Sequence, residues 1–188
     1  MARAPLGSDA IVAEAAKLAD SEGLEAVSLK RLAESLGVRP PSLYAHVDGI
    51  DDVVLRLGRR GLSELATVLG RAVEGRSGFD ALQALAAAYR GFARQHPGVY
   101  AAAQRSQALA LDPAAQAAGE DVVRVSLAVL RGYGLDGVDA VHGVRLVRVA
   151  LHGFSSLEAA GGFAMTQSVD DTFERLVALL DLGLRAEL

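Results

Sequence analysis

The sequence predicts an all-α fold in which three short N-terminal helices lead, through one long helix, into a larger helical domain. The composition favours helices, because hydrophobic residues make up 51% of the chain, many of them Ala and Leu, and aromatic residues only 5%. Apolar residues recur at spacings of three and four throughout, which is the period of an amphipathic helix. No stretch alternates over the length of a strand. We therefore expect helices joined by short breaks.

Three short helices are predicted in the first 49 residues. The first carries an apolar stripe and stops at Gly23; its stripe consists of Ile11, Val12, Ala15, Leu18 and Ala19. Ser28 caps a second helix that ends at Gly37, and its apolar face consists of Leu29, Leu32, Ala33 and Leu36. Pro40 starts a third, which runs to about His46. Helices this short cannot bury a core singly, so they must pack together.

A long helix over about 50–74 bridges to the rest of the chain, which gives domains at 1–49 and 50–188. Further helices are predicted over 79–95, after Pro97, and over 113–133, 138–160 and 170–186. Proline lacks a backbone donor and glycine is conformationally free, and these two residues account for each break. The breaks are His96-Pro97-Gly98, Asp112-Pro113, Gly132 to Gly137 and Gly161-Gly162.

Composition and charge exclude several classes of protein. No apolar run approaches the roughly 20 residues of a membrane span, and the start lacks the apolar core of a signal peptide, so we expect a cytoplasmic protein with no membrane partner. The absence of cysteine removes disulfides and thiolate chemistry. The formal charge is -4, and residues 1–47 hold five basic and six acidic side chains. The chain therefore has no excess of positive charge that would by itself favour nucleic-acid binding. Such binding must be argued from a local motif.

The local argument comes from Ser28 to Val47, which resembles the helix-turn-helix of the TetR family of regulators. The matching residues are Leu32, Ala33, Leu36, Gly37, Val38, Leu43, Tyr44, His46 and Val47. Their physics agrees, because Ala33 is small where two helices cross and Gly37 tolerates the turn. The resemblance implies that the second helix of the pair enters the major groove of double-stranded DNA.

The resemblance also assigns candidate DNA contacts. Arg39, Pro40, Ser42 and Ala45 fall at positions near base edges, and arginine can bond guanine bidentately. Lys30 falls where relatives reach a base or phosphate, and Ser28, Tyr44 and His46 match positions that bond the phosphate backbone. The alternatives are that Tyr44 is a core aromatic, that His46 only packs or caps, and that Lys30 belongs to a solvated face. The acidic stretch Asp48 to Asp52, where relatives often carry lysine, would repel phosphates and weaken nonspecific binding.

The second half predicts a dimerisation surface. Leu151-His152-Gly153 resembles the signature of a TetR subgroup named for a Trp-His-Gly motif, although the tryptophan is absent. In that family the last two long helices form a four-helix bundle with a second copy. Apolar and small residues at helical spacing fit this role, namely Ala150, Gly153, Phe173, Leu176, Val177, Leu180 and Leu184. The alternative is that these stripes face the subunit's own core.

The helices between the three short N-terminal helices and this surface are expected to enclose a site for a small apolar or amphipathic effector. Candidate walls are Tyr89, Phe92, Tyr100, Leu127, Leu130 and Phe154, and candidate polar anchors are His142, Arg145 and His152. The alternative is that these residues are ordinary core or bond to a helix end.

The function these features predict is a transcriptional regulator, a repressor that binds a palindromic operator as a homodimer and is released by an effector. The alternative is a ligand-binding or adaptor protein that has lost specific DNA binding. An enzyme is not expected, because the chain has no Gly-rich phosphate loop, no His-Glu-x-x-His and no nucleophile elbow. No cofactor or metal is predicted, and the four histidines never share the spacing of metal ligands.

Overall fold

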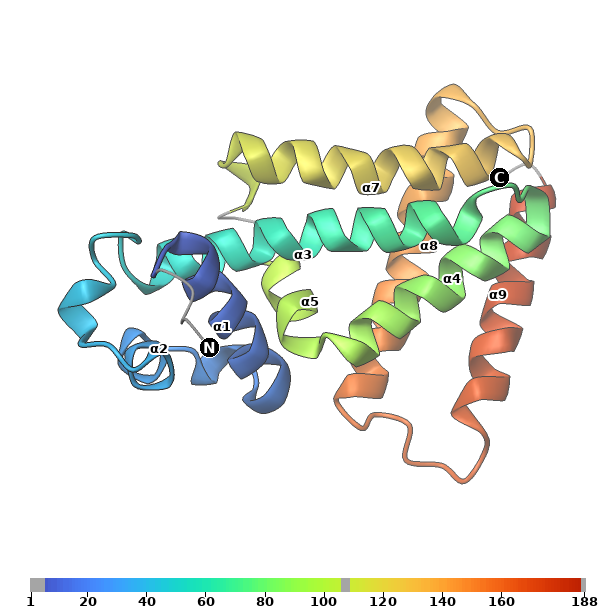
Figure 1. The fold of residues 1–188 in the computed structure, drawn as a ribbon. Helices are drawn as coiled ribbons and strands as arrows, with labels where there is room; N and C mark the ends of the chain where they lie inside the picture. Colours follow the sequence, from blue (N-terminus) through green and yellow to red (C-terminus); the bar gives the residue numbers. More distant parts are fainter. Residues whose placement is uncertain (1–5, 106–108, 187–188) are drawn as a thin grey trace. The chain divides into compact units, whose positions relative to one another are not determined.

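A computed structural model describes residues 6–105 and 109–186, and every regular element in these residues is a helix (Figure 1). The predicted all-α fold is therefore confirmed. Two compact units make up the chain. The first lies within residues 1–64 and 95–118, and the second within residues 65–94 and 119–188. Within the described ranges, no helix has both the length and the apolarity to cross a membrane.

The first unit contains residues 6–49, which we call the head. The elements of the unit are α1 (Ser8–Glu22), η1 (Leu24–Ala26), α2 (Leu29–Leu36), η2 (Pro40–Ser42), the start of α3 (Ile50–Val73) and α5 (Pro97–Ala103). As predicted, Ser28 caps α2, because its Oγ accepts a hydrogen bond of 3.3 Å from the Arg31 N–H. Gly37 ends α2 in the left-handed conformation, with φ of 64°. The turn from α2 toward η2 needs this conformation, which other residues rarely adopt.

The predicted third helix differs from the structure. A helix was expected from Pro40 to about His46, but only Pro40–Ser42 is helical, in the tighter 3₁₀ form, and turns follow. Pro40 and Pro41 have no N–H to donate, so Ser42 and Leu43 make the first bonds, back to Arg39 and Pro40. Both bonds span three residues, which is the 3₁₀ pattern.

Helix α5 packs tightly against two other helices of the first unit. A Cβ added to Gly58 or Gly61 on α3 would lie 2.8 Å from a backbone oxygen of α5, that of Ala102 or Val99 respectively. On the other side, a Cβ at Gly98 would overlap the backbone of Ala19 on α1. Glycines therefore set the close approach of α5 to both α3 and α1.

The second unit is built from the rest of α3, α4 (Gly78–Gln95) up to Arg94, most of α7 (Pro113–Arg131), α8 (Gly137–Ala159) and α9 (Val169–Arg185). These helices end within two residues of the predicted bounds, and each predicted proline or glycine break separates two helices. Apolar side chains from α4, α7, α8 and α9 form its core, including Leu82, Leu85, Leu130, Val147, Leu151, Phe173 and Leu184. Helices α8 and α9 lie side by side, joined by a loop (Figure 1).

Candidate nucleic-acid interface and effector region

The predicted base-reading segment is exposed, and buried apolar side chains anchor it to the head. Arg39, Pro40, Ser42, Tyr44 and Ala45 are all exposed, and Tyr44 keeps 62% of its surface accessible. Two apolar side chains between and after them, Leu43 and Val47, are buried in the head. A core aromatic is thus excluded for Tyr44, and the segment presents these side chains outward while Leu43 and Val47 anchor its backbone.

Ion pairs within the first unit leave Arg39 free. Arg31 bonds Glu22 at 2.6 Å, and the Lys30 ammonium lies 4.0 Å from Glu34. Across the described residues, Arg39 forms no ion pair. Neighbouring cations therefore partly neutralise the acidic residues of the head. Among the described residues, the Arg39 guanidinium is not neutralised by an ion pair.

Two predicted phosphate-contacting residues have structural partners as well. The Ser28 hydroxyl oxygen accepts the Arg31 N–H, so it orients the start of α2. His46 is half-buried, and its backbone N–H donates to the Leu43 carbonyl at 2.9 Å. The side chain of Lys30 is exposed on α2.

The acidic start of α3 is partly neutralised by its own helix. Asp52 accepts the Asp48 N–H at 3.0 Å and a bond from Arg56 Nε at 2.8 Å. The Arg56 guanidinium lowers the pKa of Asp52 below its ordinary value, and the Asp48 N–H adds to this effect. Because Arg56 faces Asp52 directly, that carboxylate repels a phosphate less than a free one would.

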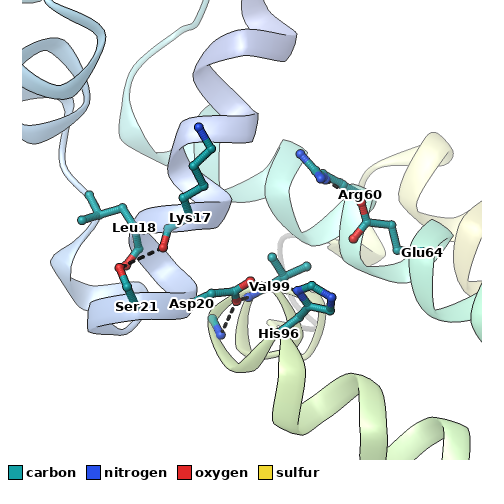
Figure 2. Close-up of polar contacts among 9 residues, drawn as sticks. Lys17, Leu18, Asp20, Ser21, Arg60, Glu64, His96 and Val99 are labelled. Atoms are coloured by element: carbon teal, nitrogen blue, oxygen red, sulfur yellow. Dashed lines mark hydrogen bonds and ion pairs between the residues drawn. The ribbon is translucent and has the colours of Figure 1, made fainter.

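A carboxylate joins α1 to α5 within the first unit (Figure 2). Asp20 Oδ1 accepts hydrogen bonds of 2.9 Å from the backbone N–H groups of both Gly98 and Val99, and Oδ2 lies 3.0 Å from His96 Nδ1. These N–H groups belong to the first turn of α5, which has no partner of its own for them. Asp20 was not among the predicted site residues. In the sequence, Asp20 is an acidic residue in the last turn of one helix, and its partners lie at a distant His-Pro-Gly break. Residue spacing alone does not show that the two meet.

The predicted effector residues fall into separate environments. In the second unit Tyr89, Phe92, Leu130 and Phe154 are buried, and Leu127 and His152 are half-buried. Burial lowers the pKa of His152, and Arg148 lowers it further, so its imidazole is neutral at pH 7. Tyr100 is buried in the first unit. His142 and Arg145 are exposed on α8.

One gap in the interior of the second unit is very narrow. A gap between α4, α7 and α8 is too narrow to admit a water molecule, and it is lined by Leu82, Leu85, Ser126, Val129, Leu130, Val144 and Val147. A wider groove of about 410 Å³ opens between α4 and α9. The groove is lined by Phe79, Gln83, Arg90, Arg94, Asp170 and Phe173, among others, and by none of the predicted effector residues.

Arg90 is a buried cation that was not among the predicted site residues. Its Nε and Nη2 donate to both Glu158 oxygens at 2.8 and 2.5 Å, and Nη2 also lies 2.7 Å from Asp170. The guanidinium stacks on Phe173, 4.7 Å from the ring centroid, and on Phe154 at 5.3 Å. The sequence signal for a buried Arg90 was its position on the apolar stripe of the helix predicted over 79–95.

The two last helices carry both buried and exposed apolar residues. Of the predicted dimer residues, Phe173, Val177 and Leu184 are buried within the chain, which for these three favours the alternative that they pack on its own core. Ala150, Gly153, Leu176 and Leu180 are half-buried. Large apolar side chains on the same helices are exposed: Val138, Val141, Leu146, Val149 and Leu157 on α8, and Leu179 and Leu182 on α9.

Known proteins resemble both halves of the chain. A family model for bacterial regulatory proteins of the tetR family matches residues 11–57, and one for a tetracyclin repressor-like C-terminal domain matches residues 82–180. An uncharacterized HTH-type transcriptional regulator of Mycobacterium tuberculosis, Rv0681, is 38% identical over 84% of this chain and 72% of its own length. YobS of Bacillus subtilis, described in the same words, is 35% identical over 85% of this chain and 82% of its own.

Solved structures share the fold. A protein of unknown function from Rhodococcus sp. RHA1 superposes with a TM-score of 0.80 at 23% identity, over 95% of each chain. ActR of Streptomyces coelicolor, a TetR family protein solved in complex with (S)-DNPA, has a TM-score of 0.71 at 21% identity, over 98% of this chain and 100% of its own. With both domain models and two relatives above 30% identity in agreement, the chain belongs to the TetR family of transcriptional regulators.

Proposed function

We propose that this regulator is a repressor that binds a palindromic operator as a homodimer and leaves it when a small effector binds. The observation that carries the proposal is the exposed segment from Arg39 to Ala45, held in place by buried Leu43. A fixed backbone with outward polar side chains is what reading a DNA groove requires. We assign the DNA contacts to residues 1–49, place the action in the cytoplasm and assign the chain no catalytic activity.

Within this segment, Arg39 is the proposed base reader. Its guanidinium is exposed and has no competing ion pair among the described residues, so no internal contact has to break before it reaches guanine. Pro40, Ser42 and Ala45 supply shape and short contacts beside it. Lys30, Ser28, Tyr44 and His46 are proposed to hold the phosphate backbone and fix the register.

We place the dimer contact on the exposed stripes of α8 and α9. Leu146, Val149, Gly153 and Leu157 are spaced by three, four and four residues, so they share one face of α8. Leu179 and Leu182 form the matching stripe on α9. A Cβ at Gly153 would meet nothing within 4 Å in its own chain, so this glycine is free to admit a close neighbour.

A symmetric dimer buries this apolar surface and presents two reading segments. On B-DNA such segments match half-sites about 34 Å apart, or a small multiple of this distance. Residues 50–188 then serve dimerisation and effector binding, with the segment 50–74 as the bridge. We retain the likeness of Leu151-His152-Gly153 to the Trp-His-Gly subgroup as part of this proposal.

The effector is proposed to bind in the second unit, between α4, α7 and α8. The solved complex of ActR with (S)-DNPA supports a small-molecule site in a protein of this fold. Leu130 lines the gap between these helices, and Tyr89, Phe92 and Phe154 are buried on α4 and α8. Because the interior gap is narrower than a water molecule, binding must move helices apart, and α3 runs from this unit into the head. We propose that this movement spoils the half-site spacing.

The test is selection of bound sequences from random duplex DNA by the purified protein at fixed salt concentration. Enrichment of a palindrome supports a dimeric repressor or activator, and effector-dependent loss of binding supports release. No enrichment by a folded dimer would overturn the proposed DNA recognition and favour a ligand-binding or adaptor role. Effector binding that leaves operator affinity unchanged would overturn the coupling.

A further inference from the structure

One buried polar atom in the second unit has no partner. Ser155 on α8 exposes only 4% of its surface, and in the described parts of the chain its Oγ is the buried side-chain oxygen or nitrogen that makes no hydrogen bond. Leaving such a group unsatisfied is costly, and native proteins hold few of them. An alanine would fill nearly the same space without this cost. The hydroxyl therefore calls for a partner that the chain does not supply.

A second helical serine shows what a satisfied hydroxyl looks like here. Ser126 on α7 donates to the Val122 carbonyl, four residues earlier, at 3.0 Å. A serine inside a helix commonly makes this hydrogen bond. Ser155 makes no equivalent bond to its own helix. The two serines thus form a matched pair, one satisfied and one not.

Ser155 lies on the inward face of α8. Val147, Leu151 and Ser155 are spaced by four residues, so they share a face, and all three are buried. Val147 also lines the narrow gap between α4, α7 and α8. The unsatisfied hydroxyl therefore lies on the same face of α8 as Val147, about two helical turns along the helix from this gap.

The described residues of the second unit bury no uncompensated charge. Arg90 is the buried charged residue among the described parts of the second unit, and both Glu158 and Asp170 neutralise it. His152, three residues before Ser155, is held neutral by burial and by Arg148, which lower its pKa. A charged molecule entering this interior would lose its hydration without gaining a counter-charge.

We propose that the Ser155 hydroxyl is the hydrogen-bonding anchor of the effector, and that the effector is an uncharged molecule with an apolar body and one hydrogen-bonding oxygen. This inference rests on the proposed effector site in the second unit. It adds the chemical class of the ligand and the residue that selects it.

The first test compares the unliganded Ser155→Ala and Ser126→Ala variants by thermal unfolding. Removing an unsatisfied hydroxyl raises stability, so we expect Tm to rise by roughly 2–4 °C in Ser155→Ala. Ser126→Ala removes a made hydrogen bond and should not raise Tm. A fall in Tm for Ser155→Ala would show that the hydroxyl already has a structural partner and would overturn the inference.

The second test uses five probes that share one ring and differ in their polar group: methylcyclohexane, cyclohexanone, cyclohexanol, cyclohexylamine and cyclohexanecarboxylate. Titration calorimetry on the full chain should show cyclohexanone and cyclohexanol binding roughly three- to tenfold more tightly than methylcyclohexane or the charged probes. Ser155→Ala should abolish this preference. Ser21→Ala, which removes a hydroxyl that bonds its own helix in the first unit, should keep it. A wild type without the preference, or a Ser155→Ala variant that retains it, would overturn the inference.

Operator binding without probe separates this inference from the proposed function. If the wild type selects no operator, the proposed repression fails whatever the probes do. If operator selection succeeds but the probe preference is absent, only the role of Ser155 fails.

Discussion

The carboxylate of Asp20 accepts hydrogen bonds from the backbone N–H groups of Gly98 and Val99, both at 2.9 Å, so the last turn of α1 closes the start of α5. The Gly98 Cα lies so close to α1 that a side chain there would overlap the Ala19 backbone. In the first unit, α5 is thus held by polar and steric contacts to α1 and by the glycines of α3. A shift of α5 should therefore displace α1 and α3 with it.

Gly98→Ala should destabilise the protein, because its methyl group would overlap Ala19 and force α1 and α5 apart. Overpacking of this kind typically costs about 1–3 kcal/mol. Urea unfolding measures the loss. Gly119→Ala is the matched control, since a Cβ at Gly119 meets nothing within 4 Å and alanine favours the helix. Equal stability of the two variants would refute the close contact.

Asp20→Ala should also destabilise the first unit, because two N–H groups of α5 lose their acceptor. A cost of about 1–3 kcal/mol is expected for such groups. Asp20→Asn retains an acceptor oxygen, so its loss of unfolding free energy should be smaller. If Asn and Ala reduced the stability equally, the capping bonds would not be the cause.

Val149→Glu should convert the proposed dimer to a monomer, because it places a carboxylate in the proposed apolar contact. Sedimentation at micromolar concentration should show at least a tenfold weaker dimer. Leu111→Glu, at another exposed apolar position, serves as the control and should remain dimeric. A dimeric Val149→Glu would move the interface away from this face of α8.

Glu158→Gln should lower stability at neutral pH but less at acid pH. The bonds from Arg90 hold the pKa of Glu158 below its ordinary value of 4.5. A carboxylate with a lowered pKa contributes stability above that ordinary value, and the contribution is lost as the pH falls through the folded-state pKa. The stability gap between wild type and Glu158→Gln should therefore narrow as the pH falls below 4.5.

Urea unfolding from pH 7 to pH 3 measures this gap, with Glu25→Gln as the control. Glu25 pairs with Arg105 but is highly exposed, so its substitution should change stability little at any pH. A Glu158→Gln gap of constant size across this range would contradict a charge-dependent bond to Arg90.

Helix positions could be predicted from the sequence because their causes are local. Prolines and glycines mark the breaks, and apolar spacing marks the helices, so α8 and α9 begin and end one residue from the predicted bounds. The segment after Arg39 was the exception. Two consecutive prolines favour a helical start but remove the donors that an α-helix needs, and the second effect decides the structure.

The polar contacts were less predictable than the helices, because the residues that form them lie far apart in the sequence. Asp20 meets Gly98, and Arg90 meets Glu158, across 78 and 68 residues. Helical spacing identifies apolar stripes but not which neighbour covers each one. Phe173 and Val177 were therefore predicted at a dimer contact, whereas the chain's own core buries them. Val149 on α8 and Leu179 on α9 are instead exposed.

The most direct test of the DNA-reading account is the affinity of wild type and Arg39→Ala for the selected operator and for its single-base-pair variants at one salt concentration. We expect wild type to lose about 1–3 kcal/mol on changing one guanine-containing pair in each half-site, and Arg39→Ala to be indifferent to that pair. Other pairs should keep their effect in both proteins. If Arg39→Ala weakened binding equally to every variant, Arg39 would contact phosphate alone and the account of base reading would be contradicted.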